Sequence, residues 1–142
     1  MEQEHRAHKL RELVVHSPKA YARLAKLLSE TGEEGVLFCL LHSDGSLQPG
    51  ELAARLDLTS GRIANILRSL ESKGLVQRES VDQDGRKMRV FLSESGKRYA
   101  ARQEEITLSQ QQALMEHLGE EDAREMLRLL EKCLRFCESC FF

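Results

Sequence analysis

A row of polar side chains recurs at helical spacing near the middle of the sequence. Arg62, Asn65 and Ser69 lie on one side of a helix in which each residue turns by about 100°, and the adjoining side is apolar. Arginine can pair with guanine, asparagine with adenine, and serine with bases or phosphates in the major groove of DNA. Thr59 and Ser60 stand at the start of this helix, where free backbone amides favour phosphate. By itself the pattern also fits an ordinary solvated helix face, so its context has to decide between the two.

A basic segment follows this helix directly. Arg78 is followed by Arg86, Lys87 and Arg89, which surround an aspartate-glycine pair at 84–85. That pair favours a hairpin because glycine accepts a positive φ angle. A basic hairpin beside a polar helix allows one element to enter the major groove while the other contacts the minor groove or the backbone. Together they predict a helix-turn-helix followed by a two-stranded wing.

The elements that carry these residues are placed by proline, glycine and capping signals. Pro49 suits the first turn of a helix, a hydroxyl at 59 or 60 can cap the next helix, and Gly74 ends that helix. Gly119 breaks the last helical stretch. The sequence predicts helices at 2–30 with a break near 17–18, 33–42, 49–56, 60–73, 93–118 and 120–140, and strands at 75–79 and 88–92. This order predicts a mainly α fold of the α+β class, a winged helix-turn-helix.

Composition limits the class of protein. A length of 142 residues favours a single domain. The net charge is −2, but residues 47–92 carry eight lysines and arginines against six acidic residues and form the only positive third of the chain. That excess is too small to indicate nucleic acid unaided. The sequence shows neither a signal peptide nor an apolar run long enough to cross a bilayer, so we expect a cytoplasmic protein without a membrane partner.

Two segments place this chain beside a known family. They are LQPGELAARLDLTSGRIANILRSLESKGLVQRE at residues 47–79 and DQDGRKMRVFLSESG at residues 82–96. Their motifs are a Leu-Ala pair at 52–53, L-x-x-x-G-L-V-x-R at 70–78, D-x-R at 84–86 and L-S-x-x-G at 92–96. Together and in register, these motifs resemble the MarR (multiple antibiotic resistance regulator) family of winged helix-turn-helix transcription factors. The flanking helices agree in order and length, so the likeness covers nearly the whole chain.

The resemblance implies a domain organisation and a partner. It implies a single MarR-type domain, residues 1–142, that forms an obligate homodimer. Residues 1–45 and 93–142 would form long N- and C-terminal dimerisation helices, and residues 46–92 would form the DNA-binding lobe. The dimer would bind a palindromic operator in double-stranded DNA, with two half-sites about one helical turn apart. Family members also carry a crevice for a small-molecule effector between the dimerisation helices and the winged lobe.

The resemblance also assigns residues to the DNA interface by position. The recognition helix would supply Gly61 in addition to Ser60, Arg62, Asn65 and Ser69. In the wing, Arg86 would enter the minor groove, with Asp84 pairing with it or orienting it. Lys87 and Arg89 would contact phosphates.

The last predicted helix carries a wide apolar face. Its apolar arc covers about half of the circumference, which is wider than the stripe that a surface helix of a monomer needs. Cys133, Cys137 and Cys140 lie on this arc at i, i+4 and i+7, and His5 and His8 lie three residues apart in the first helix. These thiols could oxidise, or bind a soft metal with the histidines, and so sense a signal. The simpler interpretation is that the cysteines pack as small apolar side chains in an interface and that the histidines are solvated.

No motif in the sequence indicates catalysis. The sequence lacks the G-x-S-x-G, phosphate-loop and H-E-x-x-H patterns, and no serine or cysteine has an obvious base partner. We therefore predict a DNA-binding transcriptional regulator without a cofactor, a dimeric repressor that a small molecule or thiol chemistry releases from its operator. The alternative is a winged-helix module that contacts proteins and has no affinity for DNA.

Overall fold

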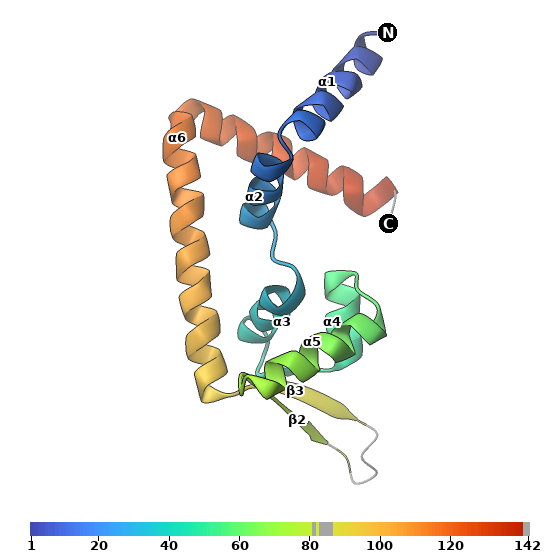
Figure 1. Ribbon diagram of the computed structural model, residues 1–142, viewed down its shortest axis with the longest axis vertical. Helices are drawn as coiled ribbons and strands as arrows, with labels where there is room; N and C mark the ends of the chain where they lie inside the picture. The colour runs from blue at the N-terminus through green and yellow to red at the C-terminus, as the bar shows by residue number, and fades with distance from the viewer. Residues whose placement is uncertain (81, 83–86, 141–142) are drawn as a thin grey trace. The chain divides into compact units, whose positions relative to one another are not determined.

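The computed structural model describes residues 1–80, 82 and 87–140, and it describes Cys140 by its backbone alone. Contacts divide the chain into two compact units, Met1–Glu105 and Ile106–Phe142. The first unit holds α1 (Glu2–His16), α2 (Pro18–Leu28), α3 (Gly32–Leu41), β1 (Ser46–Leu47), α4 (Pro49–Leu56), α5 (Ser60–Ser72), β2 (Val76–Ser80) and β3 (Met88–Leu92). Helix α6 (Glu94–Cys140) begins in the first unit and continues through the second (Figure 1). This order confirms the predicted mainly α fold with a small antiparallel sheet.

Helices α4 and α5 form the helix-turn-helix. The side chains of Gln48 and Glu51 cap the start of α4 reciprocally, and the Gln48 backbone N–H donates to Glu51 Oε1 at 3.4 Å. Asp57 adopts the left-handed conformation, with φ 52°, and turns the chain after α4. Thr59 Oγ1 accepts a hydrogen bond of 3.1 Å from the Arg62 backbone N–H, which confirms the predicted cap. Such a cap stabilises a helix by about 1 kcal/mol, and here it sets the residue at which α5 begins.

The sheet has three antiparallel strands in the order β1-β3-β2. Strand β2 pairs with β3 along its whole length, with Arg78 opposite Val90. Strand β1 pairs with the other edge of β3 and places Leu47 opposite the same valine. The sequence predicted the two longer strands, but it did not predict β1. A strand of two residues is too short to show an alternating pattern.

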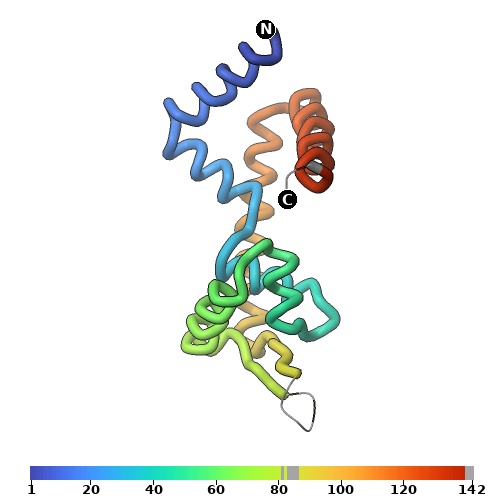
Figure 2. The backbone as a smooth tube through the Cα atoms, turned by 90° about the vertical axis from the view of Figure 1, so that its right-hand side faces the viewer, coloured from blue at the N-terminus to red at the C-terminus, as the bar shows by residue number. Residues whose placement is uncertain are grey.

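One apolar core holds the helix-turn-helix against α3, the sheet and the first turns of α6. Its members among the described residues are Val36, Leu37, Leu40, Leu47, Leu52, Ile63, Ile66, Leu67, Leu70, Val76, Val90, Leu92 and Ala100. We call this part, residues 32–100, the winged lobe, and Figure 2 shows its backbone from α3 in cyan to β3 in yellow. Leu52, Leu67 and Leu70 are at 0% exposure, so α4 and α5 are packed firmly on the core.

Helix α6 is interrupted at Gly119. Its backbone angles, φ 81° and ψ 167°, are not helical, and glycine reaches them without a steric penalty. The predicted break at this residue is confirmed. Within the part of the chain that the structure describes, no helix is both long and apolar enough to cross a membrane.

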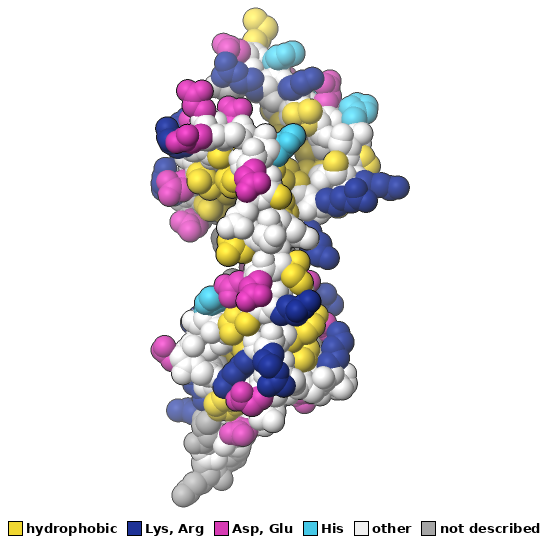
Figure 3. Space-filling view, turned by 90° about the vertical axis from the view of Figure 1, so that its left-hand side faces the viewer, with side chains coloured by type: hydrophobic (Ala, Val, Ile, Leu, Met, Phe, Trp, Pro, Cys, Tyr) yellow, Lys and Arg dark blue, Asp and Glu magenta, His cyan; other side chains and the backbone are white. Residues whose placement is uncertain are grey.

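The helices outside the winged lobe leave large apolar side chains exposed. Helices α1 and α2 contain no buried residue, and Leu10 and Leu13 are 65% and 59% exposed. In the second unit, Leu127, Leu134 and Phe136 are also more than half exposed. Figure 3 shows hydrophobic side chains, in yellow, at the surface of the single chain. We call these the uncovered apolar faces.

Candidate nucleic-acid interface

The direction in which α5 faces is set by its apolar stripe. The buried residues of that stripe are Ile63, Ile66, Leu67 and Leu70. The sequence prediction placed Arg62, Asn65 and Ser69 together on the polar side of this helix. With Ile66 included, the centre of the outward side moves away from Arg62 and towards Asn65 and Arg68. Arg68 is exposed there, and it is absent from the predicted polar face of Arg62, Asn65 and Ser69.

Asn65 and Arg68 lie side by side on this outward side. Arg68 Nη2 donates a hydrogen bond to Asn65 Oδ1, and Arg68 Nε donates to the Ala64 carbonyl at 3.4 Å. The guanidinium therefore lies along the surface of α5 next to the amide. Arginine matches the acceptor pair of guanine and asparagine matches the donor-acceptor pair of adenine. The structure thus brings together two side chains that can contact adjacent base edges.

The N-terminal end of α5 is open to solvent. Thr59, Ser60 and Gly61 are exposed, and a side chain at Gly61 would meet no atom within 4 Å. Backbone N–H groups at a helix start attract phosphate. This end of α5 can therefore approach a DNA backbone closely.

Another set of polar residues lies at the edge of α5, where it meets the first turn of α3. Lys73 Nζ donates to Glu33 Oε2 at 2.6 Å, and Ser69 Oγ donates to Glu33 Oε1. These hydrogen bonds hold the pKa of the Glu33 carboxyl below its usual value, and the bond from Lys73 has a larger effect than the bond from Ser69. Ser69 is half-buried, whereas Arg62 is exposed. The face that the sequence predicted is thus divided between an outward side and an edge that contacts α3.

The described basic residues of the wing differ in what they contact. Arg78 forms an ion pair with Glu71 of α5. Arg89 Nε donates to Ser46 Oγ at 2.6 Å and Arg89 Nη2 donates to the Ser46 carbonyl at 3.0 Å, which ties β3 to β1. Lys87 is exposed. The two remaining predicted wing residues, Asp84 and Arg86, lie outside the described residues.

The candidate sensing residues occupy exposed positions on the first and last helices. Cys133 and Cys137 are exposed on α6, and His5 and His8 are exposed on α1. The side chain of Cys140 lies outside the described set. Among the residues that the structure describes, no group of three or more histidine, cysteine, aspartate or glutamate side chains could hold a metal ion.

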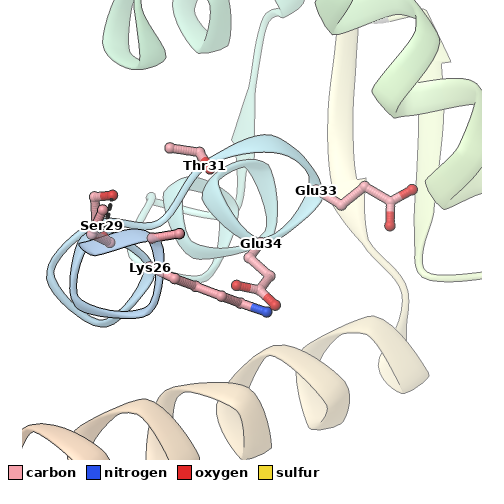
Figure 4. Close-up of a pocket in the computed structure, with 7 residues that line it drawn as sticks. Lys26, Ser29, Thr31, Glu33 and Glu34 are labelled. Carbon is pink, nitrogen blue, oxygen red and sulfur yellow. Dashed lines mark hydrogen bonds between the residues drawn. The ribbon is translucent and has the colours of Figure 1, made fainter. Parts of the chain in front are cut away.

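A hollow of about 680 Å³ lies beside the end of α2 and the start of α3. Its lining residues are Ala22, Ala25, Lys26, Ser29, Thr31, Glu33 and Glu34. Figure 4 shows that Glu33 and Glu34 leave α3 in different directions, with Glu34 on the side of Lys26. The alanines give this hollow an apolar wall, and the ammonium and carboxylate groups give it a charged rim.

The geometry of the first unit defines a class of protein. A capped helix-turn-helix, a three-stranded antiparallel sheet and a hairpin beside the second helix make a winged helix-turn-helix. Its second helix presents an outward side with an arginine, an asparagine and a free N-terminal end.

Comparison with known proteins agrees with that class. The sequence profile described as "MarR family" matches residues 35–87. HTH-type transcriptional repressor Rv2887 of Mycobacterium tuberculosis is 30% identical over 115 residues, which are 81% of this chain and 82% of that protein. The structure of the S. aureus MepR–DNA complex has a TM-score of 0.64 and 30% identity, covering 89% of this chain and 94% of that chain. A MarR transcriptional regulator from Methanosarcina mazei Go1 shares the fold, with a TM-score of 0.69, 22% identity and coverage of 95% and 98%.

The chain belongs to the MarR family of transcriptional regulators. The resemblance noted in the sequence is therefore confirmed. As a member of this family the chain is a DNA-binding regulator of transcription and not an enzyme.

Proposed function

We propose that two copies of this chain bind a palindromic operator and repress transcription from it. Each copy would place α5 in the major groove, with Asn65 and Arg68 on base edges and the open N-terminal end of α5 on the phosphates. Arg62 would lie at the margin of this interface, and Lys87 would contact the backbone from the wing. The observation that carries the proposal is the outward side of α5, which is polar and exposed and lies opposite a buried stripe of isoleucine and leucine.

The remaining wing residues enter the proposal from the sequence alone. Arg86 is proposed to contact the minor groove, with Asp84 orienting it. Arg78 and Arg89 would support DNA binding indirectly by stabilising the winged lobe, because their guanidinium groups already bind Glu71 and Ser46. Either arginine can still offer remaining N–H groups to a phosphate, since a guanidinium carries five donors.

The dimer is proposed from the uncovered apolar faces. Leucines on α1 and a leucine and phenylalanine row on the last part of α6 are more than half exposed in the single chain. Apolar patches of this kind mark protein contact sites in soluble proteins. A second copy of the chain would cover them, so we assign dimerisation to helices within residues 1–45 and 93–142. This arrangement would also supply the paired lobes that a palindrome requires.

The decisive experiment is selection of duplexes from a random pool, followed by titration of the selected duplex and a scrambled one. We expect the selected duplex to bind at least about 10³-fold more tightly. Affinity for both should fall steeply with salt, since each phosphate contact contributes about 0.9 to the log–log slope. Sedimentation should show a dimer in the absence of DNA and one dimer bound to each duplex. Absence of any salt-sensitive binding would instead favour the protein-contact module.

Release of the operator is proposed to follow either a small molecule in the hollow beside Glu34 or chemistry at the C-terminal thiols. Cys133 and Cys137 are exposed in the single chain and lie one helical turn apart, and thiols can react with an oxidant or bind a soft metal. The test repeats the titration with peroxide and with Cu(I) or Zn(II). It compares the natural chain with a variant in which Cys133, Cys137 and Cys140 are serine. Equal release from both proteins would remove the thiols from the mechanism.

A further inference from the structure

Glu33 connects the first turn of α3 to the recognition helix α5. Its two carboxylate oxygens accept from Ser69 Oγ and from Lys73 Nζ, the latter at 2.6 Å. Arg62 belongs to the same line of α5, because positions 62, 69 and 73 are spaced i, i+7 and i+11. A Cβ atom at Gly32 would lie 3.9 Å from Arg62 Nη2, so this guanidinium also lies beside the start of α3. One carboxylate thus stands beside three donors on one edge of α5.

The ion pair adds little to stability. The side chains of Lys73 and Glu33 are 53% and 35% exposed, and exposed ion pairs contribute little because water and salt screen them. The position of this ion pair matters more for DNA binding than for stability. An unpaired lysine or arginine at the edge of a recognition helix binds phosphates of any sequence, and such contacts supply most of the non-specific affinity for DNA. A carboxylate there would repel the same phosphates.

We propose that Glu33 is a specificity-determining residue, which holds Ser69 and Lys73 against α3 and thereby keeps them from the DNA backbone. Along the body of α5, contact with DNA is then left to the outward side, where Asn65 and Arg68 can distinguish bases. Specificity is a difference between affinities. On a scrambled duplex no base contact fixes the position of α5, so a released Lys73 can follow the phosphates more freely there than on the operator, and the difference in affinity becomes smaller. The inference rests on the proposed function, because it concerns how that DNA interface discriminates.

The test compares Glu33→Gln with Glu34→Gln. Both variants remove one negative charge from consecutive positions of α3. Glu34 points in a different direction (Figure 4) and, in the described part of the chain, makes no hydrogen bond to α5. We expect Glu33→Gln to raise affinity for a scrambled duplex about fivefold to tenfold near 0.1 M salt, and to steepen the salt slope by about one. The ratio of selected to scrambled affinity should fall, and Glu34→Gln should change these values much less.

Lys73→Met completes the test. In the natural chain this variant should leave the salt slope unchanged, because Lys73 is held by Glu33 rather than by phosphate. Combined with Glu33→Gln, it should abolish the gain in non-specific affinity. If Lys73→Met alone lowers the salt slope of DNA binding by about one, the proposal is wrong. This measurement tests the proposal even if Glu33→Gln does not fold. Equal behaviour of the Glu33 and Glu34 variants would also overturn it. A natural chain without salt-sensitive DNA binding would instead refute the proposed function.

Discussion

Replacement of Gly96 by alanine is expected to destabilise the winged lobe strongly. A Cβ atom at this position would lie 1.9 Å from the Leu75 carbonyl oxygen and 2.9 Å from its carbon. Both are backbone atoms, which cannot rotate away as the end of a side chain can. The Ser93 N–H donates to the same Leu75 oxygen at 3.0 Å, and Ser93 Oγ donates to the Gly74 carbonyl at 2.6 Å. The first turn of α6 is therefore held tightly against the link between α5 and β2.

The added methyl group must push this turn away and break those hydrogen bonds. Overpacking of a well-packed site costs about 1–3 kcal/mol and sometimes more, and we expect the upper end of that range because backbone has to move. Urea unfolding at a fixed protein concentration measures the loss, since a dimer's stability depends on concentration. The same unfolding curves should show an unchanged m-value if the fold is otherwise kept.

Gly50→Ala is the matched control. Gly50 lies in the first turn of α4, and a Cβ atom there would meet no atom within 4 Å. Alanine favours a helix by about 1 kcal/mol over glycine, so this variant should be neutral or slightly more stable. Equal unfolding midpoints for the two alanine variants would contradict the close approach at Gly96.

Gly96 also shows what sequence reasoning could and could not supply. The pattern L-S-x-x-G at 92–96 marked this glycine as part of the family resemblance, yet nothing local explains it. Its neighbour is the Leu75 carbonyl, 21 positions earlier, so the reason appears only in the packed structure. The helix ends behaved differently. Pro49, Thr59 and Gly119 act on their own segment of backbone, and the boundaries predicted from them are confirmed.

The candidate interface likewise contains features that the sequence could predict and features that it could not. The sequence placed α5, β2 and β3 correctly along the chain, because helical spacing and turn residues are local signals. It could not show that Arg89 binds Ser46, which is 43 positions away. Nor could it show that Ser69 of α5 donates a hydrogen bond to Glu33 of α3. Arg68 was within reach of sequence reasoning. Ile66 completes the apolar stripe of α5, and a helical wheel that includes Ile66 puts Arg68 beside Asn65.

Removal of Asn65 and Arg68 together is expected to abolish selective DNA binding. Each bidentate contact to a base discriminates by about 1–3 kcal/mol, so the double alanine variant should lose about 2–6 kcal/mol towards the selected duplex. Affinity for a scrambled duplex should fall much less. Both side chains are exposed, and their loss removes no core contact. The melting temperature should therefore stay close to that of the natural chain, which separates a binding defect from a folding defect.

Arg68→Lys and Arg102→Ala sharpen this prediction. Lysine keeps the charge of Arg68 but loses the planar fork that pairs with guanine, so it should lose selectivity while keeping the salt slope. Arg102 is exposed on α6, outside the proposed interface. Arg102→Ala removes one positive charge, as the loss of Arg68 does, and is expected to have little effect on DNA binding. If Arg68→Lys bound as the natural chain does, Arg68 would contact phosphate rather than a base. If the double alanine variant kept its selectivity, the outward side of α5 would not be the surface that recognises DNA.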